Sequence, residues 1–147
     1  ELAQVRRFSE YVDKVVEKLS TILHSCVTRA ELNERVSQTL QYFQAEELAQ
    51  VRLERFTAIS KVPNNPRMAR ALGAEQERLT EALEDLYRDI LARGWGNSQI
   101  QPRTAAVIIQ ALTVGRAVDD FTPTHVNQEN WVHVISIIIK DAIFSGN

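Results

Sequence analysis

The sequence has few of the residues that mark secretion or membrane insertion. Cys26 is the only cysteine among 147 residues, so the chain cannot form an internal disulfide. That composition favours a reducing compartment. No apolar run reaches the roughly 18 residues that a membrane span needs, and no signal peptide is visible. We therefore expect a cytoplasmic protein with no membrane partner.

Neither sign of charge dominates the chain, because the formal net charge is only −2. A nearly balanced chain is not expected to bind nucleic acid or an anionic membrane by itself. Hydrophobic residues make up 44% and charged residues 24% of the sequence. These proportions are typical of a globular protein, and the length fits one domain covering residues 1–147.

Methionine is equally scarce, since Met68 is the only one. The chain begins with the residues Glu1, Leu2 and Ala3, which have the pattern of a helix interior. Because synthesis starts with methionine, we expect a fragment of a longer protein whose N-terminal part precedes Glu1.

Recognisable catalytic motifs are absent from the sequence. The histidines His24, His125 and His133 occur in no ExxH or HExxH pattern, and the single cysteine completes no zinc ligand set. No glycine-rich phosphate-binding loop occurs either. We expect neither enzymatic activity nor a metal or cofactor, although a helical enzyme with an unrecognised site stays open as an alternative.

Only five glycines and four prolines interrupt the chain, and they fall at joints. Between them, apolar residues recur at steps of three and four, which predicts an all-α fold of about six helices. The expected helices are 2–23, 29–43, 45–60, 66–93, 102–120 and 128–144. The second and third could be one bent helix, because no glycine or proline separates them. The alternative for 132–139 is a strand, since β-branched residues favour strands.

Several helix ends have specific signals. Asn65 is expected to cap the helix that begins at Pro66, where the missing N–H has no cost. Gly94 can adopt the left-handed conformation that ends this helix. Pro102 and Asn127 are expected at the starts of the last two helices.

The last two helices are more apolar than one core requires. In residues 131–144, at about 100° per residue, the apolar side chains cover roughly 260° of arc. Such a helix needs burial from two sides. We expect these helices to form half of an intermolecular four-helix bundle in a homodimer, although a monomer with 128–144 as its central helix is the alternative. The expected interface residues are Ala105, Ile108, Ile109, Leu112, Gly115, Trp131, Val134, Ile135, Ile138 and Ala142.

The order of these signals resembles the C-terminal half of TetR-family transcriptional regulators. A long helix ends at Arg93-Gly94, a polar link leads to Pro102, and an apolar helix follows with Gly115-Arg116 and Asp119-Asp120. Trp131 occupies the aromatic position near the start of the last helix. The resemblance is clear over residues 66–144 and looser over residues 1–65.

The resemblance implies a function. In this family the last two helices dimerise, the middle helices enclose a small-molecule pocket, and an N-terminal helix-turn-helix domain binds operator DNA. This chain has no such DNA-reading unit. It therefore resembles the effector-sensing and homodimerisation domain alone, with itself, an unknown small-molecule effector and, through an upstream domain, operator DNA as partners.

Pocket residues are expected among aromatic and polar side chains on the inward faces of the first four helices, although each also suits an ordinary core position. The candidates are Tyr11, His24, Tyr42, Phe43, Phe56 and Tyr87. The alternative function is a dimeric helical scaffold or adaptor that binds no ligand. A cavity on the order of several hundred Å³ would favour sensing, and a filled interior would favour the scaffold.

Overall fold

The computed structural model describes residues 2–146, which form helices and connecting loops without any strand. This confirms the all-α class predicted from the apolar periodicity. The elements in chain order are α1 (Leu2–His24), α2 (Arg29–Phe43), η1 (Glu46–Leu48), α3 (Ala49–Lys61), η2 (Val62–Asn64), α4 (Pro66–Ala92), α5 (Pro102–Val114), α6 (Ala117–Asp120), α7 (Gln128–Ile138) and the π-helical turn η3 (Ile139–Ile143).

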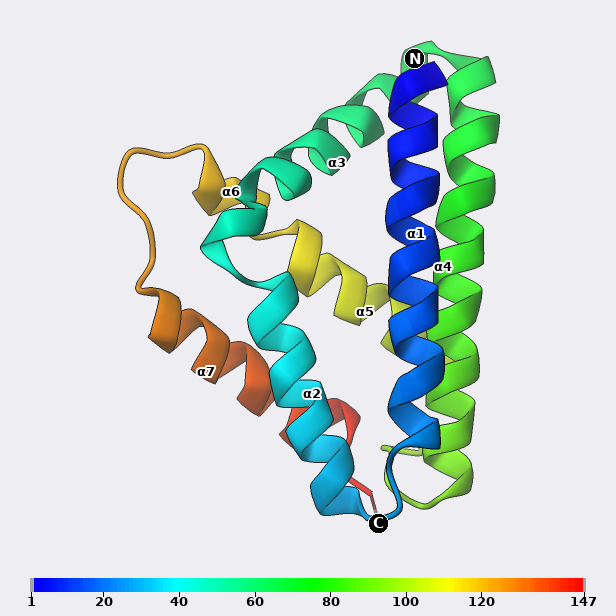
Figure 1. The fold of residues 1–147 in the computed structure, drawn as a ribbon, viewed down its shortest axis with the longest axis vertical. Helices are drawn as coiled ribbons and strands as arrows, with labels where there is room; N and C mark the ends of the chain where they lie inside the picture. The colour runs from blue at the N-terminus through cyan, green and yellow to red at the C-terminus, as the bar shows by residue number, and fades with distance from the viewer. Residues whose placement is uncertain (1, 147) are drawn as a thin grey trace.

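The two longest helices, α1 and α4, lie side by side and run in the same direction (Figure 1). Arg78 on α4 forms an ion pair with Asp13 on α1 at 2.7 Å, and Arg93 donates to the Cys26 carbonyl at 2.6 Å. Helix α5 packs against α4, α2 packs against α7, and α3 reaches across to α6. Helix α1 starts at the upper end of the long axis, whereas the chain leaves η3 at the lower end (Figure 1).

One hydrophobic core joins the inward faces of these helices, with α1 and α4 contributing equally. Its members are spaced three and four residues apart on α1, α2 and α4, as an amphipathic helix requires. The fully or nearly fully buried members include Val12, Leu19, Leu32, Leu79, Tyr87, Ile90, Ala105, Ala106, Ile135, Ile139 and Ile143.

The helix ends follow the predicted signals. The side chain of Asn65 accepts from the Met68 amide at 3.0 Å, and the side chain of Asn127 accepts from the Asn130 amide at 2.9 Å. Gly94 has a φ of 77°, the left-handed conformation that an L side chain disfavours. The caps therefore fix where the long helix α4 and the last helix α7 begin.

The helix predicted over 102–120 is interrupted in the structure. Helix α5 ends at Val114, and after Gly115 and Arg116 a separate short helix, α6, begins. Glycine is a poor helix former, and Arg116 is buried, with its guanidinium donating to the Gln44 carbonyl. The chain therefore turns at these two residues to bring Arg116 inward.

The two open alternatives for secondary structure are also settled. Residues 132–139 are helical rather than extended. Helices α2 and α3 are separate, because the chain leaves α2 at Gln44, whose side chain is fully buried. There the side-chain nitrogen of Gln44 donates to the Leu112 carbonyl, and its side-chain oxygen accepts from the Trp131 indole.

A buried tyrosine ties the C-terminal turn to the rest of the fold. The Tyr87 hydroxyl accepts from the Asn97 amide at 3.0 Å and lies 2.7 Å from the Ile143 carbonyl, to which it donates. The Asn97 amide also approaches the Ile143 carbonyl at 3.0 Å. Burial raises the pKa of Tyr87, and a backbone hydrogen bond with Asn97 lowers it by less.

Tyr87→Phe is expected to lower the free energy of unfolding by about 0.5–1.5 kcal/mol, because it removes the hydrogen bonds of the hydroxyl while the Asn97 amide and the Ile143 carbonyl keep each other as partners. Urea denaturation followed by circular dichroism measures this change. Because the folded-state pKa of Tyr87 is raised, the hydroxyl contributes its stability below about pH 10 and loses it at higher pH. The variant should therefore lose less stability than the wild type as the pH rises above about 10.

The matched control is Tyr42→Phe, since Tyr42 is 49% exposed. Equal losses of stability in the two variants would show that the Tyr87 hydroxyl does not clamp the C-terminal turn.

Candidate ligand-binding cavity

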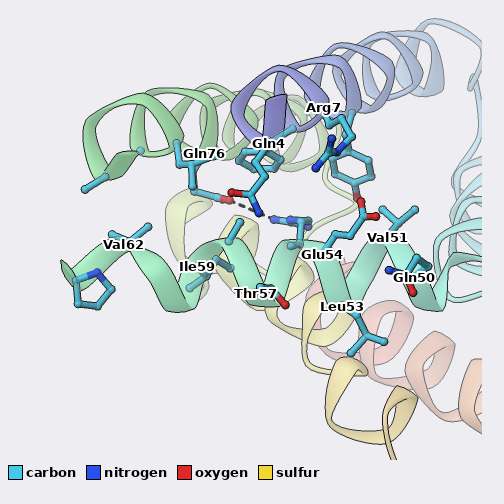
Figure 2. Close-up of a pocket in the computed structure, with 18 residues that line it drawn as sticks. Gln4, Arg7, Gln50, Val51, Leu53, Glu54, Thr57, Ile59, Val62 and Gln76 are labelled. Carbon is cyan, nitrogen blue, oxygen red and sulfur yellow. Dashed lines mark hydrogen bonds between the residues drawn. The ribbon is translucent and has the colours of Figure 1, made fainter. Parts of the chain in front are cut away.

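A cavity of about 760 Å³ lies between the first half of α1, helix α3 and the first half of α4. The lining is mainly apolar, with a few polar groups, as small-molecule sites usually are. Its residues are Gln4, Arg7, Phe8, Tyr11, Gln50, Val51, Leu53, Glu54, Arg55, Thr57, Ala58, Ile59, Val62, Pro63, Ala69, Leu72, Gly73 and Gln76. Figure 2 shows Gln4 and Gln76 directed into this space, with Glu54 rising from α3 towards Arg7.

Helix packing explains why this space is left unfilled. Helix α3 diverges from α1 and α4 (Figure 1), and the cavity is lined by residues of these three helices and of η2. Gly73 on α4 has no side chain, and a Cβ built there would meet nothing within 4 Å. Ala58 and Ala69 also face the cavity with the smallest possible side chains.

Arg55 is the central polar residue of the cavity. Its guanidinium carbon lies 5.3 Å from the Phe8 ring centre and 5.4 Å from the Tyr11 ring centre. Its Nη2 donates to Gln76 Oε1 at 3.2 Å. Burial lowers the pKa of Arg55, and its interaction with Tyr11 partly offsets this effect. The guanidinium thus lies beside a stacked pair of aromatic rings and next to a neutral amide.

Tyr11 forms the wall beside this guanidinium. Its ring stacks with Phe8 at a centroid distance of 6.3 Å and meets Phe43 edge-on at 6.4 Å. Burial raises the pKa of Tyr11, although the neighbouring Arg55 charge lowers it in part. Tyr11 therefore stays neutral at physiological pH and offers the cavity both a ring face and a hydroxyl group.

Hydrogen bonds connect the cavity to α5. Gln76 Nε2 donates to Gln110 Oε1 at 2.6 Å, and Gln110 Nε2 donates to Thr80 Oγ1 at 3.0 Å. Together with the bond from Arg55, they form an unbroken chain of side chains from α3 through α4 to α5. A change at Arg55 can therefore alter the position of α5.

A second connection runs from α3 to α6 through a buried ion pair. Arg52 binds both carboxylate oxygens of Asp120, at 2.6 and 2.9 Å, and the two side chains are only 4% and 5% exposed. Its Nη1 donates to the carbonyls of Phe43 and Ala45 at 3.1 and 2.9 Å. Arg52 is therefore fully paired and locks α3 to α6 and to the end of α2.

Exposed apolar residues are concentrated on α5 to α7. On α5 they are two consecutive residues, and on α7 they are three residues spaced over about one helical turn. We call the set the apolar face; it comprises Val107 (50% exposed), Ile108 (37%), Val118 (63%), Val134 (42%), Ile137 (44%) and Ile138 (39%). Gln44 joins the two helices by bonding to Leu112 and to Trp131.

Of the six candidate pocket residues, Tyr11 lines the cavity and the other five do not. Phe43 is partly buried against Tyr11, and Tyr42 is half-exposed with Lys18 Nζ 3.5 Å above its ring. Phe56 is also half-exposed. His24 is exposed at the end of α1 and donates to the Ser20 carbonyl, while Tyr87 holds the C-terminal turn.

The ten candidate interface residues fall into three groups. Ala105 and Ile135 are buried in the chain's own core. The partly buried group comprises Ile109, Leu112 and Trp131. The exposed group comprises Ile108, Gly115, Val134, Ile138 and Ala142.

Sequence reasoning missed the central cavity residue. Arg55 was missed because an arginine on a predicted amphipathic helix is normally solvated. Gln76 belongs to the same group of overlooked polar residues. The sequence held one signal for these residues: three helices each place a polar side chain beside an apolar stripe. Polar residues at the edge of an ordinary solvent-exposed helix face give the same local pattern, so the signal could not identify the cavity.

Residues 2–146 contain neither a metal centre nor a membrane span. No group of three histidine, cysteine or carboxylate side chains there is arranged to hold a metal ion. None of the helices there combines the length and hydropathy that crossing a bilayer requires. No family model, curated protein or solved structure matches the chain.

Proposed function

We propose that this chain is the effector-sensing and homodimerisation domain of a TetR-like transcriptional regulator. The observation that carries the proposal is the cavity of about 760 Å³ between α1, α3 and α4. A volume of this size is typical of small-molecule sites. A helical scaffold that binds no ligand has no use for such a space, so the cavity favours sensing over the scaffold alternative.

The apolar face supports the second half of the proposal. Isolated exposed apolar residues are normal, whereas the successive helices α5, α6 and α7 expose six of them, which favours an interaction surface. A second copy of the chain placed on a two-fold axis would cover this face with the same residues. The four helices α5 and α7 of the two copies would then form the bundle expected from the sequence.

The two halves are mechanically linked in the proposed domain. Arg55 and Arg52 lie one turn apart on α3, with Arg55 at the cavity and Arg52 bound to Asp120 on α6. A ligand that prefers one position of α3 shifts the population of that position. Couplings of about 1–3 kcal/mol are typical of such systems. In a dimer whose upstream heads bind sites about 34 Å apart, small helix shifts are enough to change operator affinity.

Filling the cavity tests the sensing half of the proposal. The probe is N-phenyl-1-naphthylamine, a neutral apolar dye whose emission rises on leaving water. The wild type is expected to bind it at a single site, and Ala69→Phe, which projects a ring into the cavity, is expected to weaken binding at least about tenfold. The measurement is a fluorescence titration.

Ala74→Phe is the matched control, because Ala74 lies on the same helix, is exposed and does not line the cavity. It should bind the dye as the wild type does. If the wild type fails to bind the dye, or the two variants behave alike, the cavity is not a ligand site and the scaffold alternative is favoured.

A further inference from the structure

Helix α3 carries two partly or fully buried arginines, Arg52 and Arg55, which differ in how completely their guanidinium groups are paired. Arg52 has a carboxylate partner and two backbone carbonyls. Arg55, one turn later, forms no ion pair within the described residues. Its Nε is buried and has no hydrogen-bond partner there. A buried cation normally needs an anion or full hydrogen bonding, so Arg55 is incomplete where Arg52 is complete.

The nearest acidic residue in the lining does not complete Arg55. Glu54 precedes it directly on α3, and neighbouring residues on a helix point in different directions. Figure 2 shows the Glu54 side chain directed towards Arg7 on α1. The remaining groups around Arg55 are neutral, namely Tyr11, Phe8 and Gln76.

The charges in the lining indicate how much negative charge a ligand can bring. The lining holds two cations, Arg7 and Arg55, and one anion, Glu54, so its net charge is +1. A single negative charge balances it. A phosphate monoester carries about −1.5 to −2 at neutral pH, which would leave excess negative charge beside Glu54.

The remaining lining defines the rest of the ligand. Aliphatic and aromatic side chains from all three helices surround the space, including Phe8, Val51, Ile59 and Leu72. We infer that the effector is a monocarboxylate with an apolar body, whose carboxylate binds the Arg55 guanidinium while the body fills the apolar part of the cavity. This inference rests on the proposed sensing function and names the ligand class.

The geometry of Arg55 suits this role. Arginine presents a planar fork of donors that matches a carboxylate. The rings of Phe8 and Tyr11 lie beside the guanidinium. Gln76 accepts one N–H of Nη2, and the other Nη hydrogens are the ones that a carboxylate entering the cavity would meet. Binding of a carboxylate to Arg55 would also shift the Gln76 side chain, which is the first member of the hydrogen-bond chain to α5.

The test compares two probes that differ only in their head group. Decanoate and 1-decanol compete with N-phenyl-1-naphthylamine in the wild-type chain. Decanoate is expected to displace the dye at about tenfold lower concentration than decanol, since hydrogen bonds to ionised groups are the stronger ones. In Arg55→Gln the two probes should displace the dye equally, whereas Arg55→Lys, which keeps the charge, should retain part of the preference.

Arg7→Gln is the matched control, because Arg7 is an exposed arginine of the same lining. It should keep most of the preference for decanoate. The inference would be overturned if both probes displaced the dye equally from the wild type, or if the preference for decanoate survived Arg55→Gln. In either case, binding of the dye itself would still support the proposed sensing function. If the wild type does not bind the dye at all, both the inference and the proposed function fail.

Circular dichroism melting and dye affinity show whether the Arg55 variants still fold. Should Arg55→Gln not fold, the comparison between Arg55→Lys and the wild type decides. The inference would be overturned if Arg55→Lys kept the full preference for decanoate while Arg7→Gln lost it, because the carboxylate would then bind Arg7.

Discussion

Ile138→Lys is expected to convert the proposed dimer into a monomer. Ile138 is 39% exposed beside Ile137 on α7, within the apolar face. In a two-fold interface one substitution places two lysines near the axis. An unpaired charge buried in this way costs about 3–5 kcal/mol, so the dimer dissociation constant should rise at least about 100-fold. Sedimentation equilibrium at micromolar concentration measures the change.

Val27→Lys provides the matched control. Val27 is 82% exposed in the loop between α1 and α2, far from the apolar face in the chain. It should leave the dimer unchanged. A wild type that sediments as a monomer, or a folded Ile138→Lys variant that remains dimeric, would show that the apolar face does not form the proposed interface. Obligate dimers bury about 2,000 Å² or more, which sets the area that a dimer structure should show.

The second large effect concerns the ion pair between Arg52 and Asp120. Removing one member of a buried pair leaves the other charge unpaired and destabilises a protein by about 3–5 kcal/mol. Asp120→Ala is expected to lower the free energy of unfolding by this amount, a large part of the total of about 5–15 kcal/mol that such domains have. Urea denaturation followed by circular dichroism measures the loss.

Two comparisons make this prediction specific. Asp85→Ala removes the exposed partner of Arg88, whose ion pair has side chains 57% and 76% exposed, and should cost less than about 1 kcal/mol. The double variant Arg52→Met with Asp120→Leu should be more stable than Asp120→Ala alone, because no unpaired charge remains. If Asp120→Ala and Asp85→Ala were equally mild, Arg52 would not be holding α3 to α6.

The sequence was informative wherever a feature depends on near neighbours. The side-chain caps at Asn65 and Asn127 and the glycine stop at Gly94 are local signals, and each occurs as predicted. The helix ranges followed from the apolar spacing for the same reason. The break after Val114 was missed, because it depends on Arg116 reaching the Gln44 carbonyl in another part of the fold.

The candidate site depends on contacts between residues that are far apart in the sequence, so most of it could not be predicted from the sequence. On α3 an amphipathic pattern would bury Phe56 and expose Arg52, yet Phe56 is 50% exposed and Arg52 only 3%. The partner that keeps Arg52 inside lies 68 positions away in the chain. Tyr11 was one of six candidates chosen by the same rule, and the other five do not line the cavity. Arg55 acquires its character only when α1 and α4 close around it.

The cavity also lies against the N-terminal end of α1. Gln4 and Arg7 belong to the first two turns of this helix, and both belong to the cavity wall. With a rise of about 1.5 Å per residue, any segment joined ahead of Leu2 starts only a few ångströms from an occupant. A tilt of these turns would rotate a helix that continued ahead of Leu2 as one rigid body, without any change in the proposed dimer interface.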